Sequence, residues 1–152
     1  METLERILSE HPFFEGMSPE HLRLLTGCAR NHRFDAGQYV CHAGDKADEF
    51  FLIRQGRVAL EILPPGRAPV VIQTAQEGEI VGVTWMLPPY IMVFDARAVE
   101  MTRAIGIDAA CLRGKCDADH DLGYSMMQRF LPILSKRLQV TRLQLLDVYG
   151  RR

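Results

Sequence analysis

Residues 34–60 read FDAGQYVCHAGDKADEFFLIRQGRVAL, and this stretch decides the fold. Aromatic, aliphatic and β-branched residues stand in short runs within it, and pairs that contain glycine separate the runs. Glycine adopts positive φ without a steric penalty, so it suits the tight turns between neighbouring strands. Short strands about ten residues apart, with turn residues between them, predict an all-β sandwich or barrel.

The strand pattern extends beyond this stretch and covers residues 31–108. Residues 58–62 and 70–72 are mostly apolar, and the turn sequence Pro64-Pro65-Gly66-Arg67 stands between them, which predicts a β-hairpin. Residues 109–150 read as C-terminal helices. We find no linker or repeat, so one domain over residues 1–152 is expected, although the architecture changes near Asp108.

Residues 1–30 read as helical. Ser18 is a candidate N-cap, Pro19 suits the first helical position, and Glu20 complements the helix dipole. The pair Phe13-Phe14 has two interpretations, a docking patch for a partner or core filling beneath a short helix, and we favour core filling. The expected class is therefore α+β, mainly β with helices at both ends.

Charge and composition limit the function classes. The 152 residues carry a net charge of −1, with 47% hydrophobic and 24% charged residues. No overall field attracts nucleic acid or anionic lipid. The apolar runs are too short to span a membrane, and the first eleven residues lack the apolar core of a signal peptide. We expect a cytoplasmic protein that does not enter the membrane.

The four cysteines form no C-x-x-C pair. Their spacing to His32 and His42 does not supply the four convergent ligands of a zinc site. We interpret them as buried or surface thiols in a reducing compartment. Asp117, Asp119, His120 and Asp121 fit a polar helix start better than a metal loop. No metal site is expected.

The turns of residues 34–60 resemble the opening of a cyclic-nucleotide-binding domain, the jelly-roll module of catabolite activators and of protein kinase A regulatory subunits. The residues that carry the resemblance are Ala36-Gly37, Gly44-Asp45, Ala47-Asp48, the strand Phe50 to Ile53, and Gly56-Arg57-Val58. The resemblance implies a jelly-roll β-barrel with N-terminal helices and a long C-terminal dimerisation helix.

A second match lies at residues 136–141, KRLQVT, which resemble part of the long helix of the catabolite activator. In that family the helix forms the dimer interface and a threonine, here Thr141, reaches the base. The residue pattern agrees, because apolar residues alternate four and three apart, as in a coiled coil. A homodimer is expected, rather than a helix packed on its own β-roll, and Pro132 should kink the helix. The seam comprises Met127, Leu131, Leu134, Leu138, Thr141, Leu145 and Val148.

In the family, a Gly-Glu pair opens a short helix that holds the cyclic phosphate, the Glu takes the ribose hydroxyl, and an Arg pairs with the phosphate. Here Gly82 matches the glycine, but Val83 follows it, and Met92 stands at the arginine position. Arg97 is the only nearby cation, and we expect it at the surface or paired with an aspartate. Binding of cyclic AMP or GMP in the family manner is therefore not expected. The candidate ligand-binding residues are Gly82, Val83, Thr84, Trp85, Met92, Val93 and Thr141.

The rest of this segment is apolar, and its role stays open. It could line a pocket for an uncharged or planar ligand, it could be closed by its own side chains, or it could simply complete the core. The residues are Val83, Trp85, Met86, Leu87, Tyr90, Met92 and Phe94.

Three functions follow from the resemblance. The first is a stand-alone sensor module that homodimerises, for which no cofactor is implied and a cyclic nucleotide or other small planar molecule is the possible ligand. The second is an interaction subunit that docks on a partner protein without a small-molecule ligand. The third is a transcriptional effector without its own DNA-binding domain, since Arg142, Arg151 and Arg152 are too few for a DNA arm. No catalytic motif occurs, so an enzyme is not expected.

Overall fold

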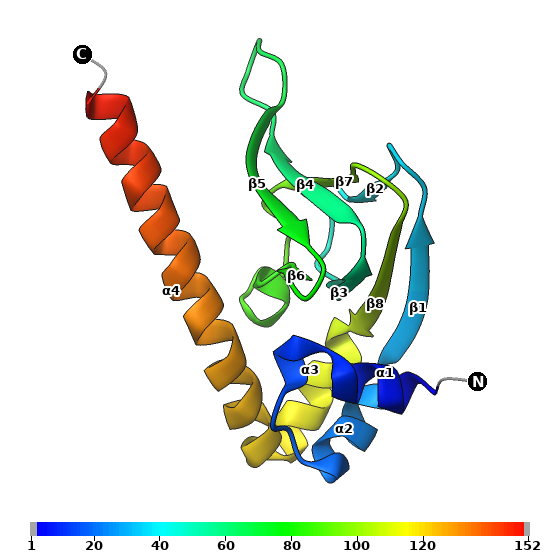
Figure 1. Ribbon diagram of the computed structural model, residues 1–152. Coiled ribbons are helices and arrows are strands. Elements are labelled where there is room, and N and C mark those ends of the chain that lie inside the picture. The colour runs from blue at the N-terminus through cyan, green and yellow to red at the C-terminus, as the bar shows by residue number, and fades with distance from the viewer. Residues whose placement is uncertain (1–2, 151–152) are drawn as a thin grey trace.

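The computed structural model describes residues 3–150, so Arg151 and Arg152 lie outside the described residues. Three short helices open the chain: α1 (Leu4–Glu10), the 3-10 helix η1 (Pro12–Phe14) and α2 (Pro19–Thr26). The strands follow, and α3 (Ala109–Ala118) and α4 (His120–Gly150) close the chain. Figure 1 shows the helices gathered beneath the β-structure, with α4 rising along one side of it.

The β-structure consists of two antiparallel four-stranded sheets, ordered β1-β8-β3-β6 and β2-β7-β4-β5. Their ladders do not join into a closed barrel within residues 3–150. The predicted α+β class and jelly-roll arrangement are confirmed, with two open sheets in place of a closed barrel. The strands are β1 (Ala29–Phe34), β2 (Tyr39–Cys41), β3 (Glu49–Gln55), β4 (Arg57–Ile62), β5 (Val70–Gln76), β6 (Ile80–Val81), β7 (Asp95–Ala98) and β8 (Thr102–Asp108).

The predicted hairpin is β4–β5, and its register pairs Val58 with Ala75. Seven glycines among the described residues have positive φ, and Gly37, Gly44 and Gly56 of the fold-deciding stretch are among them. Gly56 is the tightest case, because a Cβ there would lie 2.6 Å from the carbonyl oxygen of Met101. The turn after β3 therefore requires glycine for both its conformation and its packing.

The N-terminal helices begin as the sequence predicts. The Ser18 hydroxyl accepts a hydrogen bond from the His21 N–H at 3.2 Å, and Pro19 is the first residue of α2. Phe13 and Phe14 are buried and belong to the hydrophobic core. The core-filling interpretation of this pair is confirmed, and a docking patch at these two rings is excluded.

The C-terminal helices also begin at capping aspartates. The Asp108 carboxylate accepts from the Cys111 N–H at 2.8 Å, and Asp119 accepts from the N–H groups of Asp121 and Leu122. The polar-start interpretation of the acidic cluster is thus confirmed at Asp119. Helix α4 continues through Pro132 as one helix, and its first turns are held by Leu122, Met126 and Phe130, which are buried.

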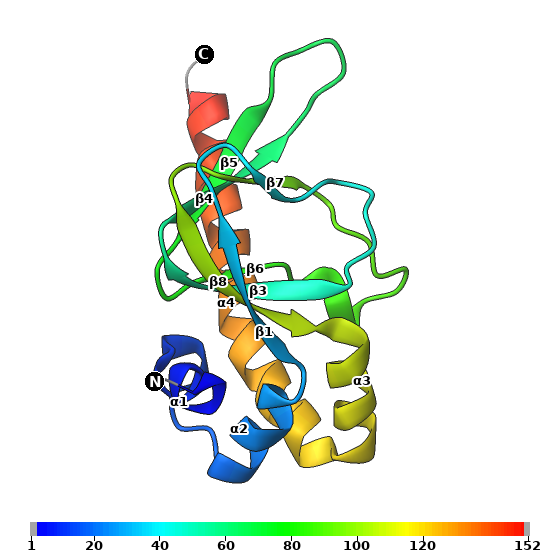
Figure 2. The ribbon, with the colours of Figure 1, turned by 90° about the vertical axis from the view of Figure 1, so that its right-hand side faces the viewer.

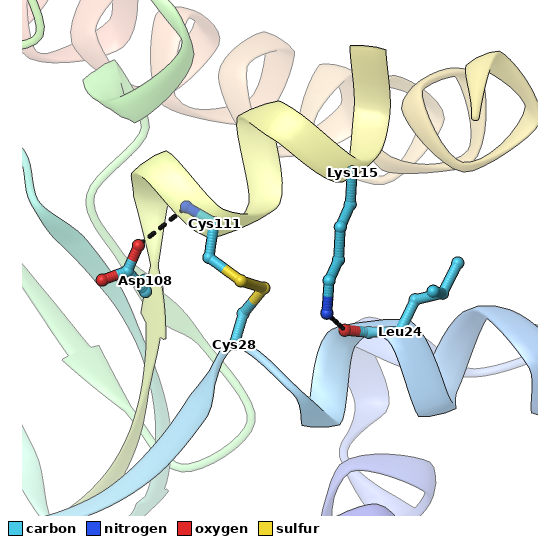
Figure 3. The surroundings of a disulfide bond; sticks show 5 residues. All are labelled: Leu24, Cys28, Asp108, Cys111 and Lys115. Carbon is cyan, nitrogen blue, oxygen red and sulfur yellow. Dashed lines mark hydrogen bonds between the residues drawn. A yellow bond between two sulfur atoms is a disulfide. The ribbon is translucent and has the colours of Figure 1, made fainter. Parts of the chain in front are cut away.

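One interpretation of the cysteines is wrong. Cys28, next to the start of β1, forms a disulfide with Cys111 in the first turn of α3 (Figure 3). The two residues are 83 positions apart, and only the packing of the helices under the sheets brings them together. Cys41 and Cys116 are free and buried, and burial raises the pKa of Cys41 to about 12 and of Cys116 to about 11.

Candidate functional site

The segment that the sequence predicts to be the phosphate-binding cassette begins where β6 ends. Gly82 has φ of +100°, and a Cβ there would lie 3.4 Å from the Cβ of Phe50 and 3.6 Å from the Cε of Met92. The backbone then forms the 3-10 helix η2 (Thr84–Met86). Val83 is the N-cap residue of η2 and makes no side-chain capping bond. The turn is therefore present, but the position after the glycine contributes no polar group.

Trp85 is the central side chain of this segment. It is 1% exposed, and its ring stacks on Phe50 with the ring centres 5.1 Å apart. Phe130 of α4 lies 5.5 Å from Trp85 and 5.4 Å from Phe50. The indole Nε1 is buried and has no hydrogen-bond partner within residues 3–150. The cassette thus places an indole ring inside the core, where it joins η2 to the base of α4.

The remaining candidate ligand residues are dispersed. Met92 is buried beside Gly82, and its N–H donates to the Asp45 carbonyl at 2.8 Å. Thr84 is half-buried, and its hydroxyl donates to the Ile91 carbonyl at 2.9 Å. Val93 is 63% exposed. The structure brings together Gly82, Trp85 and Met92, while Val93 points away from the core.

Arg113 of α3 lies next to the cassette, although the sequence pattern indicated Arg97 as the only nearby cation. Its Nη1 donates a hydrogen bond to the Trp85 carbonyl, and its guanidinium lies 4.1 Å from the centre of the Tyr90 ring. A cation over an aromatic face is attracted by the ring quadrupole. Arg113 was missed because it belongs to another element, and its function here is to hold the cassette against α3.

Arg97 has a different partner from the expected one. Its Nε donates to Glu61 Oε1 at 2.8 Å, and the Glu61 side chain is only 4% exposed. The two residues lie on β7 and β4, which are paired strands. The Asp95 carboxylate instead accepts from the Ala43 N–H at 2.8 Å. Arg97 therefore neutralises a buried carboxylate in the sheet.

A hollow of about 440 Å³ lies between β5, β6 and α4. Arg137 of α4 reaches across it and donates from Nη2 to the Ile80 carbonyl at 3.1 Å. Burial lowers the pKa of Arg137, and its Nε has no hydrogen-bond partner among the described residues. Sequence reasoning used this residue only to recognise the long helix. The hollow is lined by Phe13, Gln73, Thr74, Gln76, Gly78, Glu79, Ile80, Ile133, Lys136, Arg137 and Val140.

Helix α4 presents the predicted seam to solvent from Met127 to Val148. Thr141 is exposed, and its hydroxyl donates to the Arg137 carbonyl within the same helix, at 2.8 Å. It makes no hydrogen bond to the cassette in the described part of the chain. The apolar members of the seam are all exposed: Met127, Leu131, Leu134, Leu138, Leu145 and Val148.

Helix α3 is fixed to the N-terminal helices as well as to the cassette. The disulfide joins it to the residue before β1, and Lys115 Nζ donates to the Leu24 carbonyl at 2.5 Å (Figure 3). Residues 3–150 contain no group of three or more His, Cys, Asp or Glu side chains placed to hold a metal ion. No helix in that range is long and apolar enough to cross a membrane.

The family profile described as "cyclic nucleotide-binding domain" matches residues 31–119. The chain belongs to the cyclic nucleotide-binding domain family. The matched range covers the two sheets, the cassette and α3, and it ends where α4 begins. No match was found among curated proteins.

Solved structures with the same fold extend over most of the chain. A protein from Geobacter metallireducens GS-15, described as a cyclic nucleotide-binding protein, is 26% identical with a TM-score of 0.80, covering 91% of this chain and 99% of its own. A cyclic nucleotide-binding domain from Methylobacillus flagellatus KT is 21% identical with a TM-score of 0.78, covering 88% of this chain and 75% of its own. The sensor domain of the transcriptional regulator DNR from Pseudomonas aeruginosa is 20% identical with a TM-score of 0.72, covering 91% and 95%.

Proposed function

We propose that this chain is a regulatory sensor module that homodimerises through α4, is not an enzyme, and does not hold a cyclic nucleotide in the family manner. Membership of the cyclic nucleotide-binding family supports a regulatory role. The observation that carries the specific part is the composition of the cassette. Val83 stands where the family has an acid, and Met92, buried beside Gly82, stands where it has an arginine.

The energetic consequence of these two positions is large. A cyclic phosphate keeps one negative charge, and a hydrogen bond to a charged group contributes about 1.5–3 kcal/mol. Loss of the arginine contact alone therefore costs about one to two decades of affinity. A buried anion beside an apolar Met92 side chain would carry a further desolvation penalty. The aromatic stack of Trp85, Phe50 and Phe130 already fills the adjoining interior.

Calorimetric titration of the purified chain with cyclic AMP and cyclic GMP tests this proposal. We expect no heat of binding up to roughly 0.5 mM nucleotide, because both charged contacts are missing. A catabolite activator titrated in the same buffer serves as the positive control. Dissociation constants in the micromolar range or tighter would contradict the proposal and would mean that other groups replace the missing charges.

The proposed ligand of the sensor is an uncharged or planar small molecule. The hollow between β5, β6 and α4 supports a small-molecule ligand, because its volume of about 440 Å³ lies within the range of ligand pockets. Apolar side chains of Phe13, Ile80, Ile133 and Val140 line it beside the polar groups. An occupant would contact α4, the helix that we propose to form the dimer.

A second candidate is an interaction subunit that docks on a partner protein without a small-molecule ligand. The outer part of the β4–β5 hairpin favours it, because Leu63 and Val71 are among a group of apolar residues that is exposed there. A ligand-dependent rise in melting temperature would favour the sensor. The interaction subunit would be favoured if Val71→Lys abolished binding of a partner protein while the cassette substitution Thr84→Ala did not.

We further propose the cytoplasm as the location of the protein. The disulfide between Cys28 and Cys111 makes this testable, because disulfides in the cytosol are usually transient. Cells treated with a thiol-blocking reagent before lysis would preserve the redox state of the chain. A cytoplasmic chain is expected to carry at least part of this pair as thiols, and a fully oxidised pair would contradict the location.

A further inference from the structure

Three arginines from three adjacent strands gather on the β1-β8-β3-β6 sheet. Arg33 of β1 and Arg103 of β8 are direct cross-strand partners. Arg103 is also paired with Gln55 of β3, and the register of that ladder shifts between Ile53 and Gln55, so that Arg54 is the extra residue. Figure 2 shows β1 in front, with β8 and β3 beside it.

These arginines border a shared surface hollow. Its volume is about 380 Å³, and it is lined by Asn31, His32, Arg33, Arg54 and Arg103. We call it the arginine pocket. All five lining residues can donate hydrogen bonds, and none of them is acidic.

The arrangement is unfavourable for the sheet alone. Like charges directly opposite each other in an antiparallel pair destabilise it, and Arg33 faces Arg103 in this way. A bulge re-aims a side chain, and bulges are frequent next to functional sites. The bulge places Arg54 at the border of the same pocket.

The acidic groups nearby flank the arginine pocket and do not line it. Asp35 lies 3.4 Å from Arg33, and both side chains are largely exposed. Glu49 is already engaged, since it accepts hydrogen bonds from Arg30 at 2.8 Å and from His32 at 2.8 Å. Arg54 also borders a neighbouring hollow that includes Glu10 and Glu77. No carboxylate among the described residues lines the arginine pocket itself.

We propose that the arginine pocket binds a phosphate-bearing small molecule through the guanidinium groups of Arg33 and Arg103, which face each other across β1 and β8. Guanidinium is planar and always charged, and its paired donors match the oxygens of phosphate in a bidentate way. Asn31 supplies a further donor at the rim. The volume suits a compact di- or polyanion such as a pyrophosphate group.

The arginine pocket is separate from the cassette, which contributes none of its lining residues. The two sites therefore fail or succeed independently. Absence of cyclic nucleotide binding at the cassette says nothing about this pocket, and pyrophosphate binding here would say nothing about the cassette.

Calorimetric titration of the full chain with inorganic pyrophosphate at low ionic strength tests the proposal. We expect the wild-type chain to bind, and Arg103→Gln to weaken binding about tenfold or more through loss of a charge-assisted contact. Arg33→Gln should act in the same direction. Arg67→Gln is the matched control, because Arg67 is an exposed arginine in the turn of the β4–β5 hairpin and should leave the affinity unchanged.

The melting temperature of each variant shows whether a loss of pyrophosphate binding comes from loss of the contact or from unfolding. Arg103→Gln removes one of two facing like charges, so its melting temperature should be equal to or above that of the wild type. Pyrophosphate should raise the melting temperature of the wild type but not of Arg103→Gln. Parallel titrations with inorganic phosphate and with acetate separate phosphate recognition from general attraction of anions.

Several outcomes would overturn the proposal. One is the absence of heat with up to about 1 mM pyrophosphate at low salt, where charge interactions are strongest. Another is an Arg103→Gln variant that stays folded and binds as tightly as the wild type. Acetate binding as tight as phosphate binding would refute the phosphate assignment.

Discussion

Gly82 determines the backbone geometry of the cassette. Its φ of +100° is open to glycine at no steric cost, and the side chains of Phe50 and Met92 lie against the position of a missing Cβ. Met92 is therefore part of the core and is not a rim residue waiting for a ligand. At this scale, the residue that we predict at the family's arginine position is a packing residue.

His11 is a buried residue for which the structure implies a pH dependence near neutral pH. It is buried, its Nδ1 accepts from the Phe13 N–H at 3.2 Å, and its Nε2 lies 3.1 Å from the Ile53 carbonyl. Burial lowers the pKa of His11, while nearby Arg54 and Glu77 act in opposite directions. Protonation of the ring would add a proton at Nδ1, and the Phe13 N–H would then lose its acceptor.

We expect the free energy of unfolding to fall as the pH drops. The folded-state pKa of His11 is below its unfolded value of about 6.5. The contribution of His11 to the free energy of unfolding is therefore fully present above the unfolded pKa, and it is lost as the pH falls through the folded pKa. Urea denaturation at pH 8 and pH 5 measures it. His11→Asn should flatten the dependence, and the exposed control His120→Asn should keep it. The assignment would be refuted if the free energy of unfolding changed equally between pH 8 and pH 5 in the wild type and in both variants.

Among the elements, α3 has the most varied connections. The disulfide and Lys115 attach it to the N-terminal helices, and Arg113 attaches it to the cassette (Figure 3). Asp108 caps its first turn. A helix with only ten residues is marginal in isolation, so these contacts determine its position.

The disulfide should stabilise the fold measurably. It spans a sequence separation of 83, and closing a long loop restricts the unfolded chain, so Cys28→Ser with Cys111→Ser should lower the free energy of unfolding by about 2–4 kcal/mol. A reductant should destabilise the wild type in urea but leave this double variant unchanged.

A thiol count provides the control for that prediction. Denatured wild type without reductant should show two free thiols, those of Cys41 and Cys116. After reduction all four cysteines should react. Four reactive thiols without reductant would show that the pair is not oxidised in the purified chain.

At the scale of the whole molecule, α4 is the element that a single chain leaves uncovered. Its first turns are buried, whereas its later apolar residues face solvent beside the β-roll (Figure 1). An apolar stripe of this length on a monomer is unusual, and such patches mark interaction sites. The four-three spacing of the stripe matches the seam of a coiled coil. These features support the proposed parallel homodimer.

Sedimentation equilibrium tests the proposed dimer. We expect the wild type at micromolar concentration to have twice the chain mass, and Leu145→Lys to be a monomer because a charge in the seam would be buried. Leu143→Lys is the matched control: Leu143 is 59% exposed and Leu145 55%, but Leu143 lies outside the seam. A monomeric wild type, or equal effects of the two variants, would contradict the dimer.

Much of the architecture could be predicted because its causes are local. Glycines at turns, Ser18 and Asp119 at helix starts, and the apolar runs of the β4–β5 hairpin act within a few residues of themselves. The two departures of the cassette, Val83 and Met92, were also visible in the sequence. Whether a position carries an acid or an arginine can be read from the sequence, so this prediction about the cassette needs no coordinates.

Only the tertiary structure decided how distant residues pair. The Cys28–Cys111 disulfide, the Arg97–Glu61 ion pair and the position of Arg113 join elements far apart in the chain. Cross-strand register and helix packing set these distances, and spacing along the sequence carries no record of them. The sequence by itself determined the family and the elements and predicted the missing charges of the cassette, because these depend on local patterns. The fold decided which charges meet and which ring fills the core, because such contacts exist only after the sheets and helices have packed.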